Sequence, residues 1–149
     1  NELMTEILIK RLSKKVLLPK YETDGSSGLD LLAHIDKNIE IKPGKTEVIP
    51  TGLAVAIPKS FEIQIRPRSG LAAKNNISVL NTPGTIDSDY RGELKVILIN
   101  LSDKTFVVEK GLRIAQMVLC PIIKAKFREV ESLDETKRGL GGFGSTGVK

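Results

Sequence analysis

The sequence predicts an all-β domain of the jelly-roll type, a barrel or sandwich of short strands with one short helix. Apolar and polar residues alternate with a period of two along most of the chain, as in strands that bury one face. Residues that favour turns (Gly, Pro, Asn, Asp and Ser) separate these stretches at short intervals. Aromatic residues make up only 4% of the chain and Trp is absent, so Val, Ile and Leu must fill the interior.

Six stretches alternate clearly enough to be expected as strands, and one short stretch is expected as a helix. The strands are expected at residues 7–12, 39–42, 46–50, 61–67, 94–100 and 113–119. Turns are expected at residues 24–28, 42–45, 50–52, 82–84, 90–93 and 109–111. The helix is expected at residues 71–76 (LAAKNN), which is enough for about two turns.

With 149 residues and 40% hydrophobic content, the chain is expected to form one domain. We expect residues 1–127 to form the β-barrel, and residues 128–149 to form a polar linker and a flexible, glycine-rich arm of the same domain. No apolar run approaches the roughly 18 residues of a membrane span, and no signal peptide opens the chain. A cytoplasmic protein with no membrane partner is therefore expected.

The net charge of +5 favours an anionic ligand. Basic residues are spread along the chain and are not interleaved with aromatic ones, so no nucleic-acid partner is expected. The only cysteine, Cys120, lies in an apolar run and is expected to be a buried, inert thiol. With His34 as the only histidine, a Cys/His zinc site is excluded.

Two segments carry polar groups that suit an anion. In GLDLLA, Asp30 interrupts an apolar strand, although a carboxylate at a strand edge often only accepts bonds from turn amides. In RPRSGLA, Arg68, Ser69 and Gly70 lie where a strand ends and the helix opens. A guanidinium fork, a hydroxyl and accessible backbone N–H groups suit phosphate oxygens. A capping serine beside a surface arginine explains this second segment equally well.

Two further segments combine polar residues with strands. NTPGTIDSDYRGEL is expected to be a hairpin in which Asp87 and Asp89 point to the same face and Tyr90 follows them. An Asp-rich turn is common, but a carboxylate, a ring and an amide in one hairpin are less so. In GLRIAQMV, Arg113 and Gln116 interrupt an apolar strand. Because buried polar side chains need partners, Arg113 is expected to form a salt bridge with an Asp of the hairpin.

The last segment, RGLGGFGSTG from Arg138 to Gly147, contains five glycines and cannot fold alone. A frayed terminus explains the glycines, but it does not explain an arginine, an aromatic ring and a Ser-Thr pair. A mobile lid that closes over a charged ligand explains all of them, and we prefer this hypothesis.

In this order and spacing, the five segments resemble the motifs of the homotrimeric dUTPases (deoxyuridine triphosphate nucleotidohydrolases), from about Ile7 to Gly147. The resemblance implies a homotrimer of jelly-roll subunits that exchange their C-terminal arms. It also implies Mg²⁺-dependent hydrolysis of dUTP to dUMP and pyrophosphate, by in-line attack of water on the α-phosphorus. Small departures from the pattern, at His34, Ile35 and Leu140, touch no position that the resemblance makes functional.

The resemblance also implies a role for individual residues. Asp87, Gln116 and Ser69 would be catalytic, with Asp87 as the general base that activates water. Asp89 would be structural, as the partner of Arg113. Mg²⁺ would take its ligands from the triphosphate and from water, with no direct protein ligand.

The implied contacts to the nucleotide involve every motif. Asp30 would touch Mg²⁺ at most through water. Tyr90 would pack against the deoxyribose, Asn81 would pair with uracil, and Phe143 would stack on the base when the arm closes. The substrate-binding set implied by the resemblance is Arg68, Ser69, Gly70, Asn81, Thr85, Ile86, Asp87, Tyr90, Gln116, Arg138, Phe143, Gly144, Ser145 and Thr146.

Three other functions stay open at this point. The related dCTP deaminases share the fold and would release ammonia from dCTP, although the complete glycine-rich tail argues against them. A silent nucleotide-binding or regulatory module would show no turnover, although an intact Asp87 argues against silence. A nucleic-acid-binding barrel would bind oligonucleotides with a steep dependence on salt.

Overall fold

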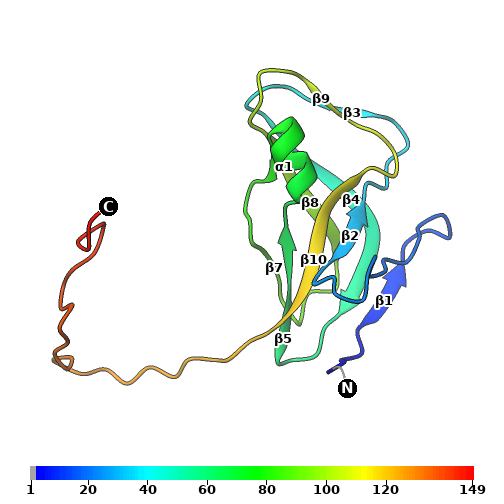
Figure 1. Ribbon diagram of the computed structural model, residues 1–149. Helices are drawn as coiled ribbons and strands as arrows, with labels where there is room; N and C mark the ends of the chain where they lie inside the picture. Colours follow the sequence, from blue (N-terminus) through cyan, green and yellow to red (C-terminus); the bar gives the residue numbers. More distant parts are fainter. Residues whose placement is uncertain (1–2) are drawn as a thin grey trace.

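The computed structural model describes residues 3–149, and nearly all of its elements are strands (Figure 1). In chain order the elements are β1 (Leu8–Arg11), β2 (Leu29–Leu32), β3 (Ile39–Ile41), β4 (Thr46–Ala56), β5 (Phe61–Arg66), α1 (Ser69–Asn75), β6 (Ile77–Val79), β7 (Gly84–Ile86), β8 (Glu93–Asn100), β9 (Phe106–Val108) and β10 (Arg113–Pro121). The predicted all-β fold with one short helix is confirmed.

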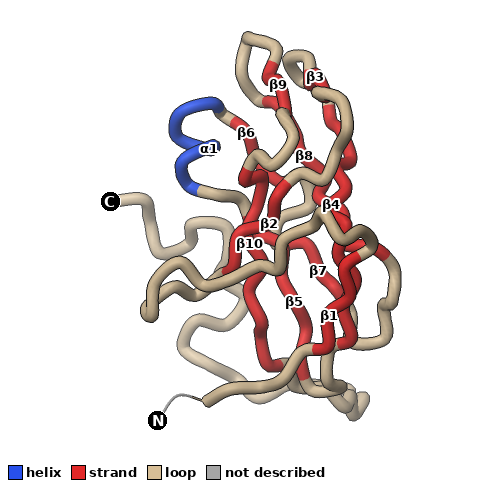
Figure 2. Tube along the Cα trace, turned by 90° about the vertical axis from the view of Figure 1, so that its right-hand side faces the viewer, coloured by secondary structure: helices blue, strands red, loops and turns tan. Residues whose placement is uncertain are grey.

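Two four-stranded antiparallel sheets form the body, with strand orders β1-β4-β8-β6 and β2-β10-β5-β7. β3 and β9 form a separate two-stranded ribbon at one end of the molecule (Figure 2). Alternate residues of β8 (Leu94, Val96 and Leu98) are buried in one cluster with Ile63 and Ile65 of β5. This shared core fixes the register of the strands, because a slip of one residue would expose a buried face.

β4 is longer than predicted because it continues through a turn-like sequence. We predicted a strand that ends at Pro50, but β4 runs to Ala56. Its pairing with β8 shifts register between Pro50 and Ala54, which marks a bulge. Gly52 lies in the bulge at φ 72°. A Cβ atom there would lie 2.5 Å from Val16, so both the positive φ and the lack of room for a side chain require glycine.

The predicted hairpin at residues 81–94 is wrong. β7 pairs with β5 in one sheet, whereas β8 pairs with β4 and β6 in the other. The chain therefore crosses between the sheets from Ile86 to Glu93. Alternation shows which face of a strand is buried, but it does not show which strand lies beside it.

The helix α1 begins two residues before its predicted start. Arg68 is its N-cap residue, and no side chain caps the helix. The alternative interpretation of Ser69 as a capping serine is therefore not supported. Ser69 and Gly70 are exposed at the start of the helix, while Leu71 packs against the core.

Cys120 is only half-buried, so the prediction of a buried thiol is wrong. Its sulfur accepts a bond from Nη2 of Arg66 at 3.7 Å, and its S–H donates to the carbonyl of Val118 at 3.6 Å. The neighbours of Cys120 in the sequence are apolar, but alternate residues of a strand face outward.

Asn100 is a fully buried polar side chain at the end of β8. Its Nδ2 donates to the carbonyls of Ile41 (2.8 Å) and Lys104 (2.7 Å). Its Oδ1 accepts from the N–H and the hydroxyl of Ser102, at 2.9 and 2.7 Å. The side chain thereby ties β8 to β3 and to the loop that leads to β9.

We expect Asn100→Ala to lower the free energy of unfolding by about 2–4 kcal/mol, because two carbonyls lose their donor. Urea denaturation at a fixed protein concentration, followed by circular dichroism, measures the change. Ser102→Ala removes only one hydroxyl of this cluster and should cost about 1 kcal/mol. Equal losses from the two variants would contradict the role assigned to the amide.

Residues 122–149 form no strand or helix, and they run away from the body as an extended segment (orange to red in Figure 1). Ile123, Phe127 and Phe143 are 97%, 93% and 114% exposed, so their apolar side chains have almost no cover. The predicted boundary after residue 127 lies inside this segment. Among residues 3–149, no helix is long and apolar enough to cross a membrane.

Candidate active site

Three polar residues of one sheet lie side by side. Gln116 of β10 is opposite Asp30 of β2 on one side and Arg66 of β5 on the other. Residues opposite each other share a face of the sheet. This is the outward face, because the adjacent Leu31 and Ile65 are buried in the core. The sheet therefore brings together predicted site residues from different motifs.

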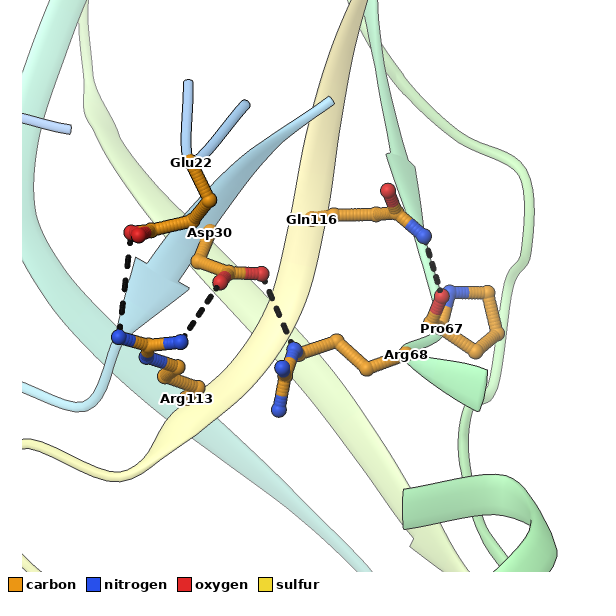
Figure 3. A network of polar contacts seen from close by, with 6 residues as sticks. All are labelled: Glu22, Asp30, Pro67, Arg68, Arg113 and Gln116. Carbon is orange, nitrogen blue, oxygen red and sulfur yellow. Dashed lines mark hydrogen bonds and ion pairs between the residues drawn. The ribbon is translucent and has the colours of Figure 1, made fainter. Parts of the chain in front are cut away.

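Arg68 reaches this row from the turn between β5 and α1. Its Nε donates to Oδ1 of Asp30 at 3.0 Å, while its two terminal nitrogens have no acceptor among residues 3–149 (Figure 3). The side chain of Asp30 is only 18% exposed, so the guanidinium compensates a carboxylate that is largely removed from water. The terminal nitrogens of Arg68 are left as donors for a ligand.

The amide of Gln116 is held at both ends. Its Nε2 donates to the backbone carbonyl of Pro67 at 3.0 Å. Gly28 lies against its oxygen, because a Cβ atom at that position would be 2.6 Å from Oε1. The first residue of GLDLLA thus leaves room for the glutamine. One hydrogen of Nε2 remains for a ligand.

Asp30, Arg68, Ser69, Gly70 and Gln116 line one small polar pocket. The three motifs GLDLLA, RPRSGLA and GLRIAQMV therefore meet here. The pocket offers a guanidinium, a hydroxyl and an amide donor, while its one carboxylate is already paired with arginine. Such an excess of donors suits an anion such as a phosphate chain.

Arg113 does not pair with Asp89, which corrects the prediction. Its Nη1 lies 3.5 Å from Oδ2 of Asp30, and its Nη2 lies 3.8 Å from Oε1 of Glu22. Asp89 forms no ion pair within residues 3–149. β10 lies beside β2, whereas Asp89 follows the edge strand β7, so the sheet order separates Arg113 from Asp89. Glu22 was not predicted, because it lies outside every motif.

Asp87 follows the edge strand β7 and does not line the pocket. Three strand spacings, about 14 Å, separate β7 from β2, which carries Asp30. Asp87 is exposed, and its backbone carbonyl accepts a bond from the N–H of Tyr90 at 3.1 Å. The hydroxyl of Tyr90 donates to the carbonyl of Glu93 at 2.8 Å, which holds the ring in place.

The other predicted residues of this segment lie near Asp87 and outside the pocket. Asn81 and Thr85 are exposed, and Thr85 pairs with Gln64 of β5. The side chain of Ile86 is partly buried and packs against the core.

The predicted residues of the arm also lie outside the pocket. Nε of Arg138 donates to the carbonyl of Gly141 at 2.8 Å, which closes a turn within the arm. Phe143, Gly144, Ser145 and Thr146 are exposed. One chain therefore assembles part of the predicted site, and the segment around Asp87 and the arm remain separate from it.

Within residues 3–149, no three His, Cys, Asp or Glu side chains gather as metal ligands. Asp30 is the carboxylate of the pocket, and its two oxygens face Arg68 and Arg113. A cation at this position would take most of its ligands from a substrate or from water.

The family model described as dUTPase matches residues 14–147. The chain belongs to the dUTPase family. The deoxyuridine 5'-triphosphate nucleotidohydrolase of Rickettsia bellii (strain OSU 85-389) is 58% identical over 146 residues, which cover 97% of each chain. That of Brucella melitensis biotype 2 is 58% identical over 138 residues, which cover 91% of this chain and 88% of the relative.

A solved structure is also similar over nearly the whole chain. It is a mutant dUTPase of Staphylococcus bacteriophage 80alpha with dUpNHpp, which matches with a TM-score of 0.86 at 26% identity. The match covers 97% of this chain and 100% of the phage chain. The part of the chain that matches the dUTPase family model includes the pocket, the segment of Asp87 and the arm as far as Gly147.

Proposed function

We propose that the chain hydrolyses dUTP to dUMP and pyrophosphate, which keeps uracil out of DNA and supplies dUMP for thymidylate synthesis. The observation that carries the proposal is the polar pocket at which three motifs meet. Its donors suit a chain of phosphates, and membership of the dUTPase family supports a uracil deoxynucleotide as the substrate.

The pocket would hold the phosphates. The terminal nitrogens of Arg68, the hydroxyl of Ser69, the backbone N–H of Gly70 and the remaining Nε2 hydrogen of Gln116 would donate to phosphate oxygens. Ser69 would act near the bridging oxygen of the leaving pyrophosphate. Phosphoryl transfer depends mainly on such positioning and on charge compensation.

The segment around Asp87 would hold the nucleoside and the water. Asp87 would accept a proton from the water that attacks the α-phosphorus. Tyr90 would pack against the deoxyribose and leave no room for a 2′-hydroxyl. Asn81 and the backbone of Thr85 and Ile86 would recognise the edge of uracil.

A homotrimer would complete the site. Because Asp87 follows the edge strand β7 and does not line the pocket, we propose that each site combines parts of different chains. The exposed apolar side chains of the arm support its docking on a neighbouring chain. Phe143 would then stack on uracil, and Arg138, Ser145 and Thr146 would grip the distal phosphates.

The pocket fits Mg²⁺ that arrives with the substrate. Bound Mg²⁺ would compensate the charge of the triphosphate, and its ligands would be phosphate oxygens and waters. Asp30 would contact its water shell, because both oxygens of this carboxylate already face arginines. Since the substrate is a free nucleotide, we propose the cytoplasm as the compartment.

The test offers the purified chain dUTP, dTTP, dCTP and UTP in turn with Mg²⁺, and identifies the products. We expect dUMP and pyrophosphate from dUTP, and little turnover of the other three nucleotides. Ammonia from dCTP would instead indicate a deaminase, and no turnover at all would indicate a silent module. Light scattering after size exclusion would show whether the chain is a trimer.

A further inference from the structure

Four charged side chains from separate parts of the fold form one continuous chain of contacts (Figure 3). Glu22 lies in the loop before β2, Arg113 opens β10, Asp30 lies in β2 and Arg68 precedes α1. The contacts measure 3.8 Å from Glu22 to Arg113, 3.5 Å from Arg113 to Asp30 and 3.0 Å from Asp30 to Arg68. Negative and positive groups alternate, so the four side chains together carry no net charge.

Asp30 divides its two oxygens between two guanidinium groups. An arginine and a carboxylate often pair through two parallel bonds. Such a pair would occupy Nε and one terminal nitrogen of Arg68. Arg113 faces Oδ2 of Asp30, and Arg68 bonds to Oδ1 through Nε alone. Both terminal nitrogens of Arg68 thereby remain available to the polar pocket.

We propose that Arg113 is a positioning residue for phosphate binding. By holding one oxygen of Asp30, it prevents Arg68 from closing a two-bond pair and leaves the terminal nitrogens of Arg68 for the substrate. Arg113 does not line the pocket, so it acts through Asp30. Glu22 holds Arg113 more weakly than Asp30 does, because the contact is longer and the side chains of both Glu22 and Arg113 are about half exposed. This role rests on the proposed function, since the phosphates are those of dUTP.

The first test is structural and does not depend on the substrate. In a crystal structure of the Arg113→Ala variant, Arg68 should turn so that Nε and one terminal nitrogen both bond to Asp30. In the Arg113→Lys variant, the ammonium group can still hold the second oxygen, so the single bond should persist. If Arg68 bonds through Nε alone in the alanine variant, the proposal is wrong.

The second test is kinetic and uses the full chain in its native assembly. Arg113→Ala should raise KM for dUTP about tenfold and change kcat by less than about threefold, because the loss falls on phosphate binding. If Arg113 were purely structural, its replacement would reduce the fraction of active protein, which would lower kcat and leave KM unchanged. Arg113→Lys should keep KM close to the value of the unchanged chain.

Arg11→Ala is the matched control for this test. It removes a guanidinium from β1 in the other sheet, which bonds to the carbonyls of Lys14 and Val16 rather than to Asp30, so both kinetic constants should stay unchanged. In an Asp30→Ala background, Arg113→Ala should have no further effect on KM, because it acts through Asp30. Full additivity of the two substitutions would contradict the proposal. If the native chain does not turn over dUTP, the proposed function is wrong, and the crystal structure still decides the role of Arg113.

Discussion

Asp87→Asn should lower kcat for dUTP hydrolysis by about 10²–10⁴-fold and leave the affinity for dUpNHpp nearly unchanged. The amide has the shape of the carboxylate, but it cannot accept the proton of the attacking water. Asp87 is exposed and forms no ion pair within residues 3–149, so its replacement should not disturb the fold. Pyrophosphate release measures turnover, and calorimetry with dUpNHpp measures binding.

Asp89→Asn is the matched control for the loss of charge. Asp89 is also exposed, two residues further along the same segment, and it has no partner in the pocket. We expect its replacement to change kcat by less than about threefold. Undiminished turnover in Asp87→Asn would remove Asp87 as the general base. Equal losses in both variants would indicate a general effect of charge.

Truncation after Lys137 should lower kcat/KM for dUTP by about 10²-fold or more, because the phosphates and the uracil ring would lose the arm groups proposed to position them. The body should remain folded. Residues 138–149 are almost entirely exposed and bond within the arm, apart from the N–H of Gly139, which donates to Thr136. Circular dichroism and light scattering check the fold and the assembly. Truncation after Gly147 removes only the last two residues and is the control.

Mixing two inactive variants tests whether each site draws on several chains. Chains with Asp87→Asn keep the arm, and truncated chains keep Asp87. After unfolding and joint refolding, mixed assemblies should contain some sites that have both an intact Asp87 and an intact arm. We expect measurable recovery of dUTP hydrolysis in the mixture. A mixture as inactive as its two components would contradict a site built from different chains.

Much of the fold could be predicted because the burial of alternate residues is a local property of the sequence. β5, β8 and β10 overlap the strands predicted at residues 61–67, 94–100 and 113–119. Two short strands, β6 and β9, were not predicted, because three residues are too few to show a periodic pattern on their own. Strand pairing could not be predicted, as the supposed hairpin at residues 81–94 shows.

The chemistry of the candidate site could be predicted better than its geometry. Asp30, Arg68, Ser69, Gly70 and Gln116 come from three motifs, and the structure brings them to one pocket. Their residue types suit an anion site, because each supplies a known donor or acceptor, and the resemblance of the motifs to those of dUTPases favoured this interpretation over the alternatives. The ion-pair partner of Arg113 could not be predicted in this way, because it depends on which strands are neighbours in the sheet.

The sequence by itself determined much of the strand pattern, the dUTPase resemblance and the kinds of side chain that line the pocket, because all three follow from local residue order and spacing. Only the tertiary structure decided that Arg113 faces Asp30 rather than Asp89. It also decided that Asp87, which follows the edge strand β7, lies outside the pocket. The reason is physical: the order of strands in a sheet sets the distances between residues that are remote in the sequence, and that order follows from packing around the shared core.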